Sequence, residues 1–295
     1  PPRQGRRQRQ MCIRDRHTTE LANTVNNLCM HADSRLQLLH VLPYLEDVDA
    51  KEIEQNFDEA NELFAKFSAL LNCPDERIER HIQMGEPESE IIKRAIIEHV
   101  DMVAMPTRTK KGSDRLLMGS VTEHVLRHAR SPVVVTRKLS DARSATNKEI
   151  EKILVPLDGT DESACIIPTV VDFAKAHKSE IILFHDKKRL NEDAFINPDD
   201  SVAESFDTVL QRIAEQGVKV SFETSYSLKP IEVILEKVVE LDVDMVAMTT
   251  RGRTGLSRFV FGSVVEEFMR KCDCPLLTIS VAPTHSMEYE EKYLG

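Results

Sequence analysis

Residues 244–278 read DMVAMTTRGRTGLSRFVFGSVVEEFMRKCDCPLLT, and they align without a gap to residues 101–135, DMVAMPTRTKKGSDRLLMGSVTEHVLRHARSPVVV. The offset is a constant 143 residues, and 15 of the 35 aligned positions are identical. A match of this length is not expected by chance, so the chain contains one structural unit twice. The two copies can be compared position by position, and the second has glycines that the first lacks.

Length and composition are those of a two-domain globular protein. A chain of 295 residues with this period leaves room for two domains of ordinary size, and 41% of its residues are hydrophobic. It contains no apolar run near the roughly 20 residues of a membrane helix, and no apolar stretch near its start suggests a secretory signal. The six cysteines show no framework spacing and predict reduced thiols. We therefore expect a cytoplasmic protein without a membrane or nucleic-acid partner.

The first sixteen residues differ in charge from the rest of the chain. PPRQGRRQRQMCIRDR contains six arginines and one aspartate, a net charge of +5 in a chain whose total is −10. Such a block can be a basic nucleic-acid arm. The stretch MCIRDR also resembles the translation of an adapter used in sequencing libraries, and on that interpretation residues 1–16 are a non-native segment excluded from fold prediction.

The second copy predicts a regular alternation of strands and helices. Residues 152–157 (KILVPL) form an apolar run that ends at Asp158-Gly159, as expected for the first strand of a βα unit. Continuously apolar strands that alternate with helices indicate a parallel sheet covered on both faces. The predicted order is strand 152–157, helix 162–177, strand 180–185, helix 202–216, strand 218–224, helix 230–241, strand 244–248, helix 260–271 and strand 275–281.

The first copy repeats most of this order but has no counterpart of the opening strand. Its elements are helix 19–31, strand 36–41, helix 50–71, strand 77–83, helix 87–100, strand 101–105, helix 118–129 and strand 132–136. Strand 36–41 corresponds to strand 180–185, so the counterpart of 152–158 falls within the excluded segment. The predicted fold class is α/β, with two tandem doubly wound domains, each a five-stranded parallel sheet flanked by helices, the first lacking its first strand. The predicted boundaries are 17–137 and 150–282 for the domains, 138–149 for a linker and 283–295 for a polar tail.

The segment that can carry chemistry is the loop after strand 244–248. Ligands of parallel sheets bind beyond the carboxyl ends of the strands, and this loop leaves such an end. Glycines let backbone amides point inward, and a helix start offers unpaired amides, so together they suit a phosphate. Arg251, Arg253 and Arg258 would add positive charge in an otherwise acidic chain. A solvated turn that needs glycine for its geometry alone is the alternative.

The pattern resembles the universal stress protein family, in the arrangement where two such domains share one polypeptide. Family members that bind ATP carry glycine, two residues, glycine, nine residues, then glycine followed by serine or threonine. On this chain the second and third glycines are Gly252 and Gly262, and Ser263 follows. The first position is Thr249, a departure that would weaken binding if that position needs positive φ or close approach to a phosphate.

The resemblance implies an adenine-nucleotide site in the second copy, with ATP as the candidate ligand. In the first copy the equivalent positions are Pro106, Thr109, Gly119 and Ser120, which lack two of the three glycines. The family places an aspartate near the nucleoside, here Asp158, although from the residues alone Asp158, Thr160 or Asp161 could equally cap the following helix. The predicted binding residues are Asp158, Gly159, Thr249, Arg251, Gly252, Arg253, Gly255, Gly262, Ser263 and Val264.

Two classes of function follow. One is a nucleotide-binding stress-response module with little or no hydrolysis and no catalytic residue; the other is a scaffold that binds no nucleotide and acts through its surface or another small ligand. An ATP pyrophosphatase is a weaker third, because VPLDGTDES lacks its glycine-serine loop. No metal site is predicted, since His124 and His128 correspond to Glu267 and Lys271 in the second copy. Strands 132–136 and 275–279 are expected to pair within the chain, giving a monomer with an internal pseudo-dimer.

Overall fold

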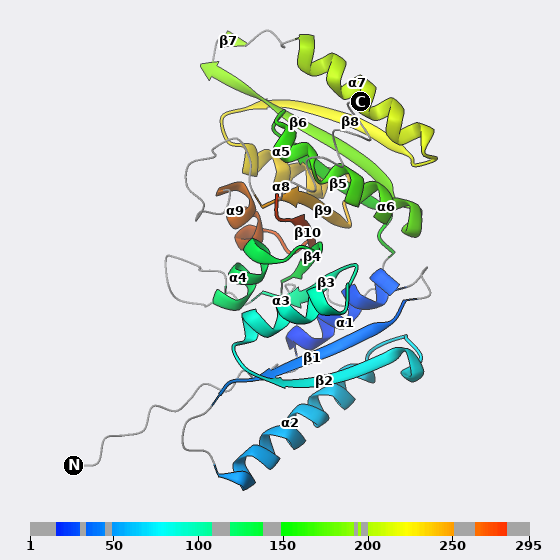
Figure 1. Ribbon diagram of the computed structural model, residues 1–295. Helices are drawn as coiled ribbons and strands as arrows, with labels where there is room; N and C mark the ends of the chain where they lie inside the picture. The colour runs from blue at the N-terminus through cyan, green and yellow to red at the C-terminus, as the bar shows by residue number, and fades with distance from the viewer. Residues whose placement is uncertain are drawn as a thin grey trace, which may run out of the picture.

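The computed structural model describes residues 16–29, 34–44, 49–107, 119–137, 149–191, 194–195, 200–250 and 263–281. The first copy contains α1 (Arg16–Cys29), β1 (Leu36–Leu42), α2 (Ala50–Ser68), the 3₁₀ helix η1 (Asp75–Arg77), β2 (Ile78–Met84), α3 (Pro87–Ile97), β3 (Val103–Pro106), α4 (Ser120–His128) and β4 (Val133–Thr136). The second contains β5 (Lys152–Leu157), α5 (Asp161–Ala164), α6 (Ile167–His177), β6 (Glu180–Asn191), β7 (Ala194–Phe195), α7 (Asp200–Glu215), β8 (Val220–Ser227), α8 (Pro230–Glu240), β9 (Met245–Thr249), α9 (Ser263–Lys271) and β10 (Leu276–Ile279). The predicted α/β alternation is present in both copies (Figure 1). Most of the predicted linker and tail, and residues 1–15, lie outside the described residues.

The second copy has the predicted five-stranded parallel sheet. Its strand order is β10-β9-β5-β6-β8, and each neighbouring pair is parallel. The short β7 adds an antiparallel pairing to the far end of β6. β5 is therefore the central strand, with β6 on one side and β9 on the other.

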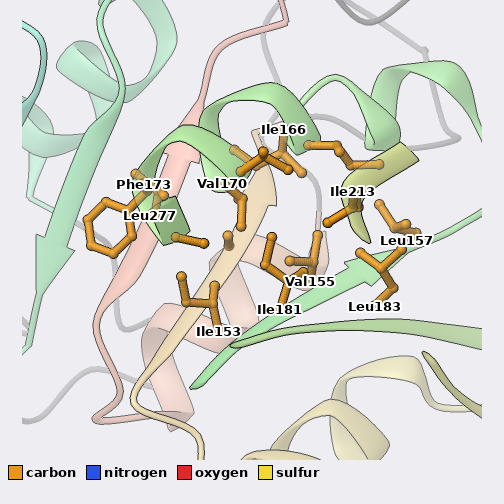
Figure 2. Close-up of a cluster of buried hydrophobic side chains, with 14 of the residues drawn as sticks. Ile153, Val155, Leu157, Ile166, Val170, Phe173, Ile181, Leu183, Ile213 and Leu277 are labelled. Atoms are coloured by element: carbon orange, nitrogen blue, oxygen red, sulfur yellow. The ribbon is translucent and has the colours of Figure 1, made fainter. Parts of the chain in front are cut away.

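Side chains of the central strands alternate between two apolar layers, since successive residues of a strand point to opposite faces. Ile153, Val155 and Leu157 of β5 belong to one buried cluster with α6 and α7 (Figure 2). Leu154 belongs to the other cluster, with α8 and α9. Both faces of β5 are covered, which explains why its sequence is continuously apolar.

The two copies are joined edge to edge by their last strands. β4 pairs antiparallel with β10, and Val134 lies opposite Leu277. At the offset of 143 residues Leu277 is the counterpart of Val134, so this pair lies on the local two-fold axis that relates the copies. The predicted pairing of the two last strands is confirmed, and it merges strands of both copies into one sheet.

The prediction for the first sheet was wrong in its connectivity. β3 and β4 extend the large sheet, whereas β1 and β2 pair only with each other and form a separate two-stranded parallel sheet. In the second copy β5 connects the corresponding strands, β9 and β6. Among the described residues no strand holds that position in the first copy, so its sheet is divided in two.

Three element boundaries also differ from the prediction. The single helix expected at 162–177 is broken into α5 and α6, because Pro168 has no amide hydrogen to give and its ring crowds the preceding turn. β6 continues to Asn191 instead of ending at residue 185, paired with β8 through Lys188. α1 begins at Arg16, a residue that the sequence assigned to the non-native segment.

Candidate functional site

The strand order of the second sheet reverses at β5. The chain passes from β5 to β6 and β8 on one side, and then to β9 and β10 on the other. In open parallel sheets this reversal opens a crevice outside the carboxyl ends of the two central strands, where ligands bind. The pairs Ile153–Met245 and Leu154–Val246 set the register, so the ends of β5 and β9 lie at the same level.

Asp158 and Gly159 leave the end of β5 in a tight turn. The Asp158 carboxylate oxygen Oδ1 accepts hydrogen bonds from the Thr160 amide at 3.1 Å and from its hydroxyl at 2.6 Å. Gly159 has a φ of +81°, a conformation that glycine adopts without strain. The turn therefore fixes the half-buried Asp158 carboxylate at the mouth of the crevice.

Thr160, not Asp158 or Asp161, caps the helix that follows. Its hydroxyl oxygen accepts a hydrogen bond from the Ser163 amide at 3.2 Å, and the Ser163 hydroxyl donates to the Thr160 carbonyl at 2.8 Å. Ser163 also accepts from the Asp158 amide at 3.3 Å. The choice that the sequence left open is thus settled, and the signal was present in the T-D-E-S order of a capped helix start.

Thr249 is the last residue of β9, and its side chain is only 5% exposed. Its backbone is paired with Ile279 in extended conformation, so the position does not require positive φ. Threonine is well suited to this conformation, which removes the backbone objection to it. Thr250, which sequence reasoning did not single out, follows it, is 3% exposed and donates its amide to the Ile279 carbonyl at 3.0 Å.

Ser263 and Val264 begin α9. Ser263 is exposed at the amino end of the helix, whereas Val264 is half-buried and packs against the apolar cluster beneath α8 and α9. The Val264 side chain is therefore a packing residue, and only its backbone is suited to a ligand. The other predicted binding residues lie outside the described residues: Arg251, Gly252, Arg253, Gly255 and Gly262.

β6 borders the crevice on the other side of β5. The Nδ1 atom of His185 lies 2.9 Å from the Leu157 carbonyl oxygen, so the imidazole ties β6 to the end of β5. The Asp186 carboxylate accepts hydrogen bonds from the hydroxyls of Ser225 and Ser227 at 2.6 and 2.7 Å. The sequence placed His185 as a main-chain contact, as observed, but gave no signal for the two serines of β8.

The equivalent positions of the first copy are arranged differently. Pro106 ends β3 and offers no amide hydrogen. Gly119 precedes α4 with a φ of −59°, and a Cβ atom there would meet nothing closer than the Thr122 hydroxyl at 3.9 Å. Neither conformation nor crowding requires glycine at this position. Ser120 begins α4, and Thr109 lies outside the described residues.

The described residues contain neither a metal-binding cluster nor a membrane-spanning helix. No group of three or more His, Cys, Asp or Glu side chains within them could hold a metal ion. The rings of His124 and His128 stack with centroids 4.2 Å apart, and the His128 Nδ1 atom contacts the His124 carbonyl. No helix in this part of the chain is both long and apolar enough to cross a bilayer.

Comparison with known proteins identifies the family. The model of the universal stress protein family matches residues 18–137 and again 149–280. The chain therefore belongs to the universal stress protein family and contains its domain twice.

Individual relatives are distant. Universal stress protein MJ0531 of Methanocaldococcus jannaschii is 32% identical over 81 residues, which are 28% of this chain and 48% of that protein, so the match spans about half of the relative's length. Universal stress protein YxiE of Bacillus subtilis is 26% identical over 148 residues, 43% of this chain and 97% of that protein. The crystal structure of a universal stress protein from Archaeoglobus fulgidus has a TM-score of 0.67 at 20% identity, covering 89% of this chain and 92% of that one. At that identity the likeness concerns the fold alone.

Proposed function

We propose that the second copy binds ATP or a related adenine nucleotide in the crevice beyond the carboxyl ends of β5 and β9. The protein would then act as a cytoplasmic stress-response regulatory module. The observation that carries the proposal is the reversal of strand order at β5, which places Asp158, Gly159 and Thr249 at one edge of the sheet. A crevice at such a reversal is the usual ligand site of open parallel sheets.

The amino end of α9 supports phosphate binding at this edge. The first amides of a helix lack intrahelical partners and carry a partial positive charge, which favours an anion. Ser263 is exposed at that end, so its hydroxyl can donate to a phosphate oxygen. The arginines and glycines between Thr249 and Ser263 belong to the proposal on the strength of the sequence.

Gly119 bears on the role of glycine at Gly262, its counterpart. The start of α4 accommodates a Cβ atom at Gly119, so the fold of a helix start in this position does not itself need glycine. A glycine at Gly262 is then better explained by close approach of a ligand to the backbone. The first copy, with Pro106 in place of Thr249, is expected to bind no nucleotide.

We assign no catalytic residue to the second copy and propose little or no hydrolysis. Asp158 Oδ1 already accepts two hydrogen bonds from Thr160, and the Asp186 carboxylate accepts two from serines. A carboxylate engaged in this way is a poor general base, because the bonds stabilise its charged form. Incubation with ATP should release phosphate no faster than buffer does.

A scaffold that binds no nucleotide is the second candidate, and the buried Thr249 favours it. Its side chain lies at the end of β9, where the ATP-binding pattern of the family has glycine. If that side chain excludes a phosphate, the protein would act through the surface of the joined copies. Thr249→Gly should then create or strengthen nucleotide binding.

The test is calorimetric titration of ATP into the wild-type chain and two matched variants, Gly262→Val and Gly119→Val. We expect one site in the wild type, unchanged affinity in Gly119→Val and a loss of at least about tenfold in Gly262→Val, equivalent to about 1.4 kcal/mol. The two variants make the same change at the same position of the repeat. Equal heats for wild type and Gly262→Val would contradict the proposed site.

The same titration should include cAMP. Another solved universal stress protein is described as a complex with cAMP, but its TM-score against this chain is 0.36, so its ligand carries no argument here. Heat with cAMP alone would replace ATP as the ligand. No heat with either nucleotide, in wild type or Thr249→Gly, would leave the scaffold.

A further inference from the structure

The divided sheet of the first copy leaves two strand edges facing an unfilled position. β3 pairs with β4 on one side only, and β1 pairs with β2 on one side only. Their counterparts in the second copy, β9 and β6, both pair with β5. We call the position between β1 and β3 the strand slot. An unpaired strand edge offers a row of backbone donors and acceptors to an incoming strand.

The strands beside the strand slot are less buried than their counterparts. All five residues of β9 are buried, and so are residues 181–184 of β6. In β1, by contrast, Leu36, Leu38 and Leu39 are only half-buried, as are Val103 and Ala104 of β3. Neither of the two large apolar clusters includes a residue of β1 or β2. The core therefore stops at β3, although the strands beyond it are apolar.

His40 shows the same difference at a single side chain. Its counterpart His185 contacts the carbonyl oxygen of Leu157, the residue paired with it in β5. No hydrogen bond to His40 is found among the described residues, and its ring packs edge-on against Phe64 with centroids 6.4 Å apart. The carbonyl that would answer His40 belongs to a strand in the slot.

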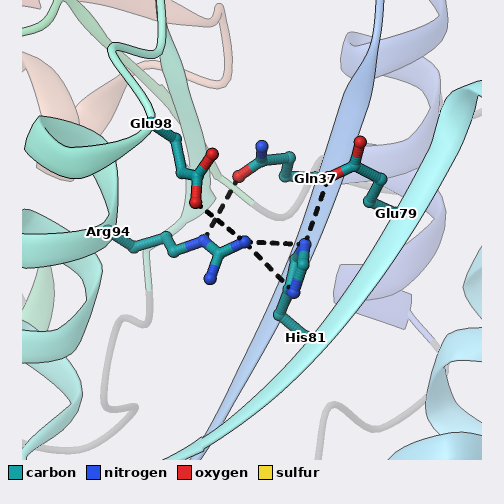
Figure 3. A network of polar contacts seen from close by, with 5 residues as sticks. All are labelled: Gln37, Glu79, His81, Arg94 and Glu98. Carbon is teal, nitrogen blue, oxygen red and sulfur yellow. Dashed lines mark hydrogen bonds and ion pairs between the residues drawn. The ribbon is translucent and has the colours of Figure 1, made fainter.

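Polar contacts hold the two walls of the slot in relation to each other. Arg94 of α3 hydrogen-bonds Gln37 of β1 at 3.4 Å and His81 of β2 at 2.9 Å, and it pairs with Glu98 at 3.2 Å (Figure 3). α3 in turn packs on α4, which covers β4. α1 and α2 lie on the opposite face. A strand entering the slot would thus meet a partly formed site between two helical layers.

We propose that the strand slot is an acceptor site for an extended apolar peptide of about six residues, bound parallel to β1. The second copy supplies the template, because β5 holds the equivalent position with the sequence KILVPL. Main-chain hydrogen bonds to β1 and β3 give affinity, and side chains of both strand faces enter the two helical layers. Both alternating sets of side chains must therefore be apolar, which excludes the polar-apolar alternation of a one-sided strand.

The first test uses a fluorescent peptide with the sequence of residues 152–159, KILVPLDG, added to the full chain. We expect saturable binding of one peptide per chain, at least about tenfold weaker for the same peptide carrying Val155→Asp. Binding should slow amide exchange in β1 and β3 but not in β6 and β9, and should shift the His40 ring resonances. Binding without these changes, or equal binding of the two peptides, would overturn the proposal.

The second test supplies the strand within the chain. One variant carries residues 152–161 in place of residues 1–16, and its control carries the same insert with Val155→Asp. We expect slower exchange in β1 and β3 and a higher unfolding midpoint for the first variant only. If neither the free nor the joined segment protects β1 and β3, the slot does not accept a strand.

Mass analysis of the same samples distinguishes a second copy of the chain from a peptide partner. Protection of β1 and β3 that develops in dimers without added peptide would show that another copy fills the slot, and would overturn the peptide proposal. Nucleotide binding in the second copy is independent of these outcomes, so the two proposals fail separately.

Discussion

Individual residues mark where the two copies have diverged. Thr278 is fully buried at the joint between them, and among the described residues its hydroxyl oxygen has no hydrogen-bond partner. Its counterpart in the first copy is Val135, also buried. A buried hydroxyl without a partner is destabilising, and an apolar side chain of the same shape avoids that loss.

Thr278→Val should therefore stabilise the protein by about 1 kcal/mol. The measurement is the urea midpoint at constant slope. Ser179→Ala is the control, because the buried Ser179 hydroxyl donates to the Ile150 carbonyl and its removal should lower the midpoint. A lower midpoint for Thr278→Val would show that its hydroxyl has a partner.

The His40 side chain should make stability depend on pH. Burial lowers the pKa of His40 below its ordinary value of 6.5, so the unfolded state binds the proton more readily than the folded state. Its contribution to stability is present above about pH 6.5 and is lost as the pH falls through the lowered folded value. Replacing His40 by Phe should reduce the difference in urea midpoint between pH 7.5 and pH 5.5. An unchanged difference would exclude this role.

At the scale of elements, sequence patterns predicted nearly every strand and helix that the structure describes. Apolar runs such as 152–157 are unambiguous, since strands buried on both faces are continuously apolar. The misses have local causes. Pro168 lies within a helical pattern and breaks it, and the extension of β6 past His185 is polar and gives no apolar signal. Turn hydrogen bonds around Asp158 depend on geometry that spacing alone does not fix.

Sheet connectivity was less accessible, because pairing depends on contacts between distant segments. The joint between β4 and β10 was predictable from the duplication, whereas the separation of β1 and β2 follows from the lack of a strand between β1 and β3 among the described residues. Of the candidate site, the sequence identified the two strand ends and the helix start. It could not determine how the Asp158 carboxylate is used.

The joint itself can be tested with Val134→Asp. Val134 is fully buried opposite Leu277, so an unpaired carboxylate there should lower stability by about 3–5 kcal/mol. Val239→Asp is the control, because Val239 is 68% exposed and its replacement should change stability by no more than about 0.5 kcal/mol. Similar urea midpoints for the two variants would mean that the joint contributes little.

For the whole molecule, the pairing of β4 with β10 satisfies within one chain the edges that two separate chains would otherwise share. We therefore expect a monomer of 33.5 kDa by light scattering at micromolar concentration. A stable dimer as the sole species would contradict the internal pseudo-dimer as the complete assembly.

The two copies are thus unequal partners: one has a continuous sheet with a crevice at its strand reversal, and the other has a divided sheet. Amide hydrogen exchange of the full chain, with and without saturating ATP, tests this inequality most directly. We expect ATP to slow exchange in segments 157–164 and 249–264, and to leave segment 104–122 unchanged. Slower exchange in segment 104–122, or no change in either copy, would contradict the assignment of the nucleotide site to the second copy.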